Sequence, residues 1–319
     1  MFRSMLTTRI VELEIAKEYP KQEMRTPVHL CIGQEAPPAG ISASLTNSDL
    51  VVSGHRSHGH YISKGGNISS MIAEIYGKVT GCSKGLGGSQ HLVDTSVGFM
   101  GSAPILGSTI SIGTGLALGL KMLKKTNVVI SYFGDSATEE GIFHESLNFA
   151  SIHQLPIVFA CENNLYSTHT SLAKRQPKRN ISELGKAHLV PGFTVDGNDV
   201  RKVFEISKTA IDRARRGDGP SLIEFMTYRW LEHVGPNSDE DLGYRTKSEI
   251  EEWKKHDPIE IESNRLALEI PDWANQRLKI ENEIRFEVNI SFEFAKNSPF
   301  PDPLNLESGI YPEKVISYA

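Results

Sequence analysis

The chain has 319 residues, and 39% of them are hydrophobic, which is enough to bury a sizeable α/β core. Its net charge of −5 offers no general attraction to nucleic acid or to an anionic membrane, so we expect neither as a partner. The sequence also lacks a run of about eighteen apolar residues, so it predicts no transmembrane helix. The three cysteines, Cys31, Cys82 and Cys161, are far apart and odd in number, so we expect no disulfide framework and a cytoplasmic location.

Hydrophobic periodicity, caps and breakers predict alternating helices and strands. After an amphipathic N-terminal helix, the expected elements are helices at 67–76 and 111–124, strands at 128–133 and 156–161 with a helix between them, a strand at 193–196, a helix capped by Asn198 or Asp199 that runs to 216, a strand at 221–228, and helices at 248–255 and 270–296. Prolines at 299, 301 and 303 predict an extended tail. We therefore expect one α/β domain over 1–319 with a mainly parallel central sheet flanked by helices, an N-terminal helical segment (about 1–25), and a C-terminal helix and tail (about 270–319).

One predicted βαβ unit carries the strongest chemical signal. The β-branched and aromatic run at 128–133 is typical of a strand buried on both faces, and Asp135 comes just after it. Ser136 or Thr138 is expected to cap the following helix, and the next strand, at 156–161, is followed by a turn that contains Asn164. A right-handed crossover makes the two strands parallel and close. Asp135 and Asn164 should therefore lie on the same carboxyl edge, where ligands bind in open α/β folds.

The donor atoms at this edge indicate the kind of ligand. A carboxylate, a side-chain carbonyl and a nearby main-chain carbonyl are hard oxygen donors, which suit magnesium or calcium rather than zinc. The protein supplies three ligands at most and magnesium needs about six, so water and a phosphorylated ligand should supply the rest. The main-chain amides of Ser136 and Ala137, at a predicted helix start, are suitably placed to bind that phosphate.

The residues now match a known family. Gly-Asp-Ser at 134–136, followed after the next strand by Asn-Asn at 163–164, resembles the thiamine diphosphate motif. The surrounding segment is similar to the alpha subunit of the decarboxylating component of 2-oxo acid dehydrogenase complexes. The resemblance extends over nearly the whole chain, through the segments 29–35, 54–60, 84–91, 228–233 and 298–301. It implies the thiamine diphosphate-binding fold, with thiamine diphosphate and Mg2+ as cofactors.

The resemblance also implies a role for each matching position. The implied magnesium ligands are the side chains of Asp135 and Asn164 and the main-chain carbonyl of Tyr166. The implied cofactor contacts are Gly134, Ser136 and Ala137 at the diphosphate, Arg56 reaching it, His55 where a tyrosine is often found, and Leu106 at the aminopyrimidine ring. The metal-site residues Asp135, Asn164 and Tyr166, together with His233, are also implied to bind the cofactor. The catalytic candidates are His233, implied to lie near the reactive carbon, and His58, expected in a loop that folds over the cofactor.

Simpler interpretations of these residues stay open. The histidines at 55, 58 and 60 also suggest a zinc cluster, but they lack a helical pair at four-residue spacing and a nearby cysteine. A surface position for His58 and a purely structural role for His233 are the alternatives to catalysis. The glycine series from 107 to 119 favours close helix packing over a dinucleotide site, because no strand precedes it as that fingerprint requires.

The resemblance finally implies that this chain forms part of an active site. In the two-chain members of the family, the glutamate that assists cofactor activation comes from a beta subunit. Glu35 and Glu162 are weaker candidates, because Glu35 suits a structural or interface role and Glu162 belongs to the metal turn. The implied protein is an α2β2 heterotetramer that decarboxylates a 2-oxo acid and passes the acyl unit to a lipoyl group on an acyltransferase component. The alternatives are an acetoin dehydrogenase, a carboligase or transketolase-like thiamine enzyme subunit, and a non-catalytic cofactor-binding subunit.

Overall fold

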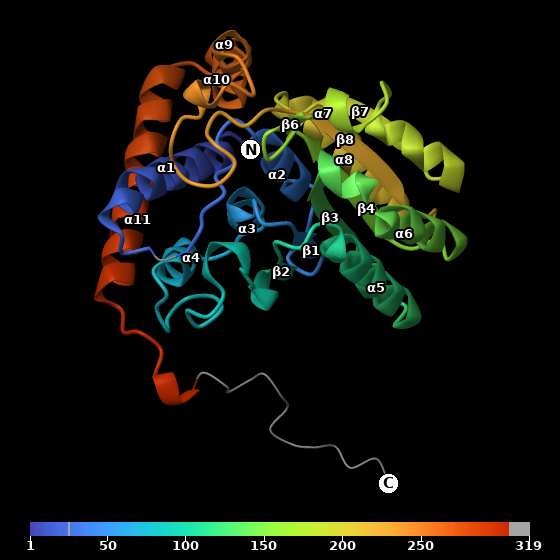
Figure 1. Ribbon diagram of the computed structural model, residues 1–319, viewed down its shortest axis with the longest axis horizontal. Helices are drawn as coiled ribbons and strands as arrows, with labels where there is room; N and C mark the ends of the chain where they lie inside the picture. The colour runs from blue at the N-terminus through green and yellow to red at the C-terminus, as the bar shows by residue number, and fades with distance from the viewer. Residues whose placement is uncertain (25, 306–319) are drawn as a thin grey trace.

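The centre of the structure is a six-stranded parallel sheet with the order β2-β1-β3-β4-β8-β7 (Figure 1). The computed structural model describes residues 1–24 and 26–305. The strands of the sheet are β1 (Leu50–Ser53), β2 (Phe99–Ser102), β3 (Val129–Gly134), β4 (Ile157–Asn163), β7 (Gly192–Asp196) and β8 (Ser221–Met226). A separate antiparallel hairpin pairs β5 (Tyr166–Ser167) with β6 (Thr170–Ser171). The predicted α/β class with a mainly parallel sheet is confirmed.

Helices flank this sheet and extend to one side of it (Figure 1). The α-helices are α1 (Phe2–Glu18), α2 (Ala36–Ser42), α3 (His58–Ser63), α4 (Ile68–Ile75), α5 (Ser108–Met122), α6 (Gly141–Ile152), α7 (Leu172–Arg175), α8 (Val200–Arg215), α9 (Lys247–Lys254), α10 (Pro258–Glu269) and α11 (Trp273–Asn297). The 3-10 helices are η1 (Tyr19–Lys21), η2 (Gly88–Gln90), η3 (Thr95–Val97), η4 (Asp135–Glu139), η5 (Ile181–His188), η6 (Glu240–Leu242) and η7 (Pro303–Asn305). None of the helices in the described ranges has the length and apolar character that crossing a membrane requires.

The two ends of the chain differ in part from the predicted elements. The N-terminal helix is α1 followed by η1, and residue 25 lies outside the described residues. The predicted C-terminal helix is α11, but α10 precedes it and the sequence pattern did not reveal α10. The turn η7 interrupts the predicted extended tail, and its continuation at 306–319 lies outside the described residues. The single-domain organisation stays a prediction.

Both faces of the sheet are apolar. In β4, Ile157, Phe159 and Cys161 enter one core while Val158 and Ala160 enter the other. Helices α5 and α6 supply side chains to the first core, and α2 and α8 supply side chains to the second. A strand that alternates between two apolar cores has the near-continuous hydrophobic sequence from which it was predicted. The sheet is therefore a rigid support for the residues at its carboxyl edge.

The two predicted helix caps have different outcomes. The Asp199 carboxylate accepts hydrogen bonds from the main-chain amides of Arg201 (3.2 Å) and Lys202 (3.3 Å), which confirms it as the cap of α8. The cap predicted at Ser136 or Thr138 is wrong, because η4 occupies these residues and α6 begins only at Gly141. The Thr138 hydroxyl is used inside this turn, where it donates to the Asp135 carbonyl at 2.7 Å.

The glycines of α5 only partly follow the expectation of close packing. A Cβ on Gly113 would lie 3.0 Å from Val52 and 3.2 Å from Ser131, so this glycine lets α5 approach the sheet closely. Gly115 and Gly119 have no heavy atom within 4 Å of such a Cβ. For these two glycines the expectation of close packing within the described chain is wrong.

Candidate active site

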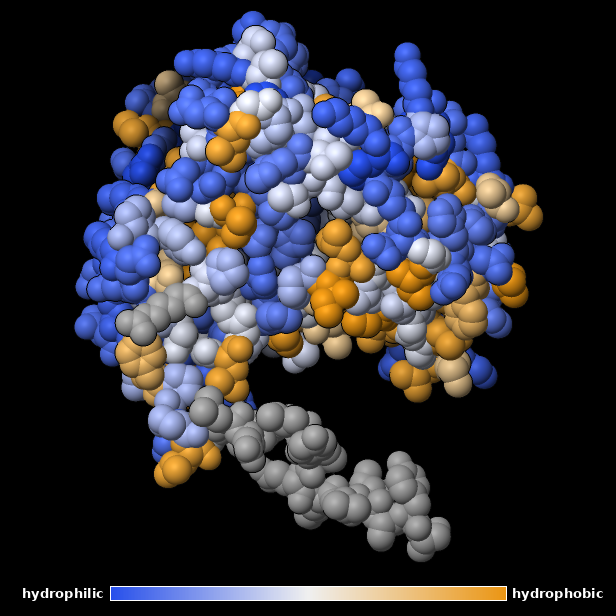
Figure 2. Space-filling model, in the orientation of Figure 1, coloured by the Kyte–Doolittle hydropathy of each residue, from blue (hydrophilic) through white to orange (hydrophobic). Residues whose placement is uncertain are grey.

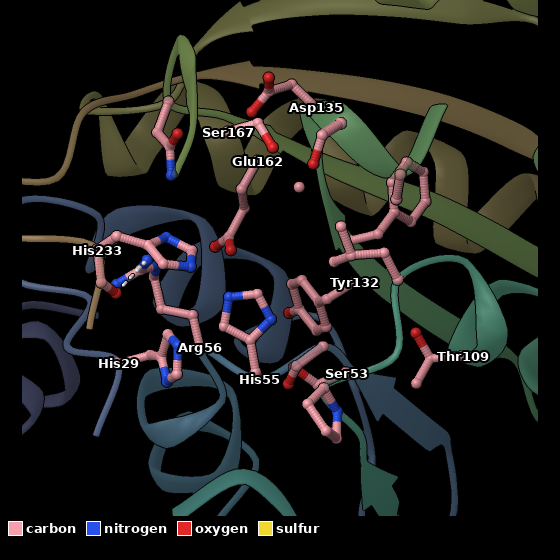
Figure 3. Close-up of a pocket in the computed structure, with 18 of the residues that line it drawn as sticks. His29, Ser53, His55, Arg56, Thr109, Tyr132, Asp135, Glu162, Ser167 and His233 are labelled. Carbon is pink, nitrogen blue, oxygen red and sulfur yellow. Dashed lines mark hydrogen bonds between the residues drawn. The ribbon is translucent and has the colours of Figure 1, made fainter. Parts of the chain in front are cut away.

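A pocket at the carboxyl edge of the sheet is lined by residues from four strand ends (Figure 3). The strand ends contribute His55 and Arg56 after β1, Asp135 after β3, Asn164 after β4 and His233 beyond β8. Gly134 pairs with Glu162 across β3 and β4, which places the two predicted metal-binding segments side by side. Parallel strands end on one edge of a sheet, so residues far apart in the sequence converge there.

The carboxylate of Asp135 is buried at the first of these strand ends, with 2% of the residue exposed. It forms an ion pair with the guanidinium of Arg175 on α7. The amide of Gln176 donates to the Asp135 carbonyl at 3.2 Å. Burial raises the pKa of Asp135, and Arg175 opposes this by favouring the charged carboxylate. Arg175 was absent from the predicted site because an isolated arginine in a turn-rich segment has no distinguishing sequence signal.

The second strand end presents the side-chain carbonyl of Asn164. Its Oδ1 accepts a hydrogen bond from the Tyr166 amide (3.3 Å), and its Nδ2 donates to Gln34 Oε1 (2.9 Å). Tyr166 also lines the pocket, while its hydroxyl donates to Glu249 at 2.8 Å. The Nε2 of Gln34 is buried in the pocket lining and has no hydrogen-bond partner within 1–24 and 26–305. A buried amide without a partner is costly, so this edge of the pocket suits a polar ligand.

The backbone after β3 leaves room for such a ligand. A Cβ placed on Gly134 would meet no heavy atom within 4 Å, and Ser136 and Ala137 also line the pocket. Arg56 adds a positive charge, although its guanidinium donates to the main-chain carbonyls of Leu30 and His233, the latter at 3.3 Å. Burial lowers the pKa of Arg56 to about 10, so the side chain stays charged at neutral pH. Oxygen donors, open backbone and a buried cation together fit a metal-bound diphosphate.

A group of three imidazole rings lies on another wall of the pocket (Figure 3). The ring centroids of His29 and His55 are 4.4 Å apart, and that of His233 is 5.1 Å from His29 and 5.5 Å from His55. The Gly235 amide donates to the Val28 carbonyl at 2.8 Å, which holds the segment of His233 against the segment of His29. His29 was not a predicted site residue, although it opens the matched segment 29–35.

Burial is the main cause of the low basicity of these rings. It lowers the pKa of His29 to about 2, that of His55 to about 4 and that of His233 to about 3, and the nearby Arg56 charge lowers all three further. All three imidazoles are therefore neutral at pH 7. A neutral imidazole can accept a proton, donate one or bind a metal.

The prediction that His58 lies in a loop over the cofactor is wrong. His58 is the first residue of α3, is fully buried and does not line the pocket. Its Nδ1 lies 3.0 Å from Glu12 Oε1 and its Nε2 lies 2.8 Å from Ser89 Oγ. The Glu12 carboxylate is itself buried and also accepts from the Cys31 amide at 2.8 Å. His58 therefore pairs with a buried acid in the core.

His60, two residues further on, reaches the pocket instead. Its ring stacks on Tyr132 with centroids 3.8 Å apart, and its Nε2 lies 3.1 Å from Glu162 Oε1. The rings of His55, His58 and His60 thus have different neighbours, which excludes the zinc cluster considered from the sequence.

The two glutamates considered as activating groups have different surroundings. Glu35 is fully buried, forms an ion pair with Arg9 and accepts from the Gly33 amide at 3.1 Å. This arrangement matches the structural role expected for Glu35, and Glu35 does not line the pocket. Glu162 does line the pocket, where His60 is its hydrogen-bond partner.

Leu106 lies in the pocket lining, as its implied contact with the cofactor requires. It is 40% exposed, and the neighbouring Ile105 is 72% exposed. The pocket therefore has an apolar rim that faces solvent in the single chain.

Fold and site together define a class of protein, an α/β enzyme component that binds an anionic cofactor at the carboxyl edge of a parallel sheet. The sequence profile of the family described as Dehydrogenase E1 component matches residues 3–304. The chain belongs to this family.

Individual relatives agree with the family assignment. The alpha subunit of acetoin:2,6-dichlorophenolindophenol oxidoreductase from Bacillus subtilis is 37% identical over 312 residues, which cover 98% of this chain and 92% of the relative. The pyruvate dehydrogenase E1 component subunit alpha from Rhizobium meliloti is 36% identical over 312 residues, covering 97% and 88%. The testis-specific mitochondrial form of that subunit from Homo sapiens is 36% identical over 311 residues, covering 97% and 79%.

Proposed function

We propose that this chain is the alpha subunit of a thiamine diphosphate-dependent 2-oxo acid dehydrogenase. With a beta subunit it decarboxylates a 2-oxo acid and passes the acyl unit to a lipoyl acceptor on an acyltransferase component in the cytoplasm. The observation that carries this proposal is the convergence of Asp135, Asn164, Arg56 and His233 at one edge of a parallel sheet. Membership of the Dehydrogenase E1 component family supports the same conclusion.

The diphosphate end of the site follows from the oxygen donors. Asp135 and Asn164 bind Mg2+ through their side chains and Tyr166 binds it through its main-chain carbonyl, because these are hard oxygen ligands. The backbone at Gly134, Ser136 and Ala137 lines the diphosphate, in the space that the glycine leaves open. Arg56 adds a permanent charge toward the phosphate groups. The partnerless Nε2 of Gln34 supports a polar ligand in the same place.

The substrate end of the site contains the neutral histidines. When bound, thiamine diphosphate supplies the carbanion and the electron sink for decarboxylation. His233 holds or transfers a proton there, because its imidazole borders the pocket. His55 packs beside it, and Leu106 borders the pocket at the position implied to contact the aminopyrimidine ring.

Features of the surface support a beta subunit partner. The cavity measures about 220 Å3, which is below the ~300–1,000 Å3 typical of small-molecule sites, as expected for part of a shared site.

Hydrophobic residues gather over α5 and α6 (Figure 2). The exposed ones on these helices are Ile112, Met122, Phe149 and Ile152. An apolar surface of this kind is typical of a protein interface, and we propose that it contributes to an α2β2 heterotetramer.

The test is to co-produce the chain with a beta-like partner and to measure reduction of an artificial acceptor with a panel of 2-oxo acids and with acetoin. We expect activity only when both chains, Mg2+ and thiamine diphosphate are present. Acetoin belongs in the panel because one relative is an acetoin oxidoreductase subunit. Activity of this chain alone would contradict the two-chain proposal and favour Glu162 as the activating acid. Absence of Mg2+-dependent thiamine diphosphate binding by the two-chain complex would favour a non-catalytic subunit.

A further inference from the structure

The glycine-rich loop at 83–88 folds around one buried carboxylate. Glu74, in the last turn of α4, is fully buried, and its two carboxylate oxygens accept hydrogen bonds from four main-chain amides of this loop. The donors are Ser83 and Gly85, each 2.8 Å from Oε2, and Gly87 and Gly88, 2.7 and 3.0 Å from Oε1. Hydrogen bonds to a charged acceptor are stronger than neutral ones, so four of them hold the loop in one conformation.

The two residues after this loop reach the active site. The hydroxyl oxygen of Ser89 lies 2.8 Å from Nε2 of His58, and the Ser102 hydroxyl donates to the main-chain carbonyl of Gln90 at 2.9 Å. The side chain of Gln90 lines the pocket, where its Nε2 lies 3.1 Å from Nδ1 of His29. A rigid support therefore holds the glutamine amide against one of the pocket imidazoles.

The polarity of this contact decides the tautomer of His29. An amide nitrogen donates and cannot accept, so Nδ1 of His29 accepts the hydrogen bond from Gln90. Burial is the main cause that lowers the pKa of His29 to about 2, so the ring carries one proton at neutral pH. That proton is on Nε2, because Nδ1 is the acceptor. Nε2 forms no hydrogen bond with the residues that the structure describes, and it is not among their sealed polar atoms, so it can donate to a ligand.

We propose that Gln90 is a positioning residue that holds His29 in the Nε2–H tautomer, so that His29 donates a hydrogen bond to an oxygen atom of the 2-oxo acid. The identity of this ligand rests on the proposed function, whereas the tautomer does not depend on it. The guanidinium of Arg56 lies beside His29 (Figure 3) and donates to the carbonyl of Leu30, the next residue in the chain. A neutral N–H next to this cation favours an anionic ligand, whereas the other tautomer would turn a lone pair toward the ligand oxygen and repel it.

The tautomer is tested by long-range 1H–15N NMR of the full chain labelled with 15N-histidine, because nitrogen chemical shifts separate protonated from unprotonated ring nitrogens. The His29 signals are those missing in His29→Gln. We expect Nε2–H in the parent chain and Nδ1–H in Gln90→Glu, because a carboxylate only accepts. Gln90→Met removes the amide without adding a charge and should populate both tautomers.

A matched control separates the effect of charge from that of the contact. Gln276 is exposed on α11, and Gln276→Glu should leave the His29 signals unchanged. An Nδ1–H tautomer in the parent chain, or retention of the parent tautomer in both Gln90→Glu and Gln90→Met, would overturn the proposal. A purely structural role for Gln90 would not reverse the positions of the ring proton.

Turnover of the two-chain complex tests the substrate contact. Gln90→Met should lower kcat/KM for the 2-oxo acid by about tenfold, roughly the effect of one hydrogen bond. The affinity for thiamine diphosphate should stay within about threefold, because the proposed diphosphate contacts lie elsewhere in the pocket. Unchanged kcat/KM in Gln90→Met would overturn the proposed donation to substrate. An inactive parent complex would instead contradict the proposed function, and the NMR spectra would still decide the role of Gln90.

Discussion

The guanidinium of Arg175 forms an ion pair with the carboxylate of Asp135, the residue that follows β3 at the edge of the sheet. Arg175 also pairs with Glu139, and both arginine contacts come from the short helix α7. A protein cation therefore neutralises the carboxylate proposed to bind magnesium. Magnesium bound as we propose would have to compete with this arginine for Oδ2 of Asp135.

Replacing the competing cation should strengthen metal binding. We predict that Arg175→Ala tightens Mg2+-dependent binding of thiamine diphosphate by about tenfold, which corresponds to about 1.4 kcal/mol. Calorimetric titration of Mg2+ at fixed thiamine diphosphate measures the change. Lys174→Ala is the control, because Lys174 is exposed on the same short helix. Weaker thiamine diphosphate binding in Arg175→Ala would contradict this prediction. It would mean that attraction between Arg175 and the diphosphate outweighs the competition between Arg175 and the metal.

Removing the carboxylate itself should abolish cofactor binding. Loss of a residue that only hydrogen-bonds to a metal ligand reduces metal affinity by about 10- to 100-fold. Because Asp135→Ala removes a proposed direct ligand, we expect its loss of metal affinity to be larger than this. Metal and thiamine diphosphate should be lost together in a dialysis experiment that measures both. Glu139→Ala removes a neighbouring carboxylate that also pairs with Arg175, and this control should retain both ligands. Normal metal content in Asp135→Ala would contradict the assignment.

His233 should affect turnover and spare binding. General acid–base catalysis contributes about 10²- to 10⁴-fold to rates, and we expect His233→Ala to lower kcat by an amount in this range. The affinity for thiamine diphosphate should stay within about threefold, because the proposed diphosphate contacts lie at other strand ends. Steady-state kinetics of the two-chain complex and a direct cofactor titration separate the two effects. An unchanged kcat would favour the structural role for His233.

The buried pair of Glu12 and His58 should contribute to stability. Glu12 accepts hydrogen bonds from the Cys31 amide at 2.8 and 3.0 Å and contacts His58 Nδ1 at 3.0 Å. Breaking a buried pair costs about 3–5 kcal/mol, so Glu12→Ala should lower the free energy of unfolding by about that amount in urea denaturation. Glu14→Ala removes a surface pair with Lys17, and this control should cost less than about 1 kcal/mol. Equal losses in the two variants would contradict a structural role for the pair.

The neutral histidines make stability depend on pH. A histidine of an unfolded chain has a pKa near 6.5, whereas burial and Arg56 hold the pKa of His29 at about 2, that of His55 at about 4 and that of His233 at about 3. The unfolded state therefore binds more protons below pH 6.5. The stabilisation is fully present above this pH and is lost progressively as the pH falls toward the folded-state values.

The urea midpoint should accordingly decrease between pH 7.5 and pH 5. In His55→Phe the difference in proton uptake between the unfolded and folded states should be smaller by about one proton in the acidic part of this range. His153→Phe, at an exposed position, is the control and should retain the slope of the parent chain. An identical slope in all three proteins would show that His55 is protonated to the same extent in the folded and unfolded states.

Much of the sheet and the diphosphate edge was predictable because the signals are local. The apolar run of β3, the βαβ crossover and the positions of Asp135 and Asn164 all lie within one short segment, and the carboxyl edge follows from the parallel order. The Asp199 cap of α8 was predictable for the same reason. The cap at Ser136 or Thr138 was not, because a 3-10 turn that uses the Thr138 hydroxyl replaced the expected helix start.

The sequence by itself determined the α/β class, the family and the strand ends that carry the oxygen donors, because chain periodicity and short motifs encode them. The tertiary structure alone decided that His58 is paired with Glu12 in the core, that Arg175 neutralises Asp135, and that His29 meets His55 and His233. These contacts join residues far apart in the chain. They depend on how helices and loops pack over the sheet, and no local pattern records that packing.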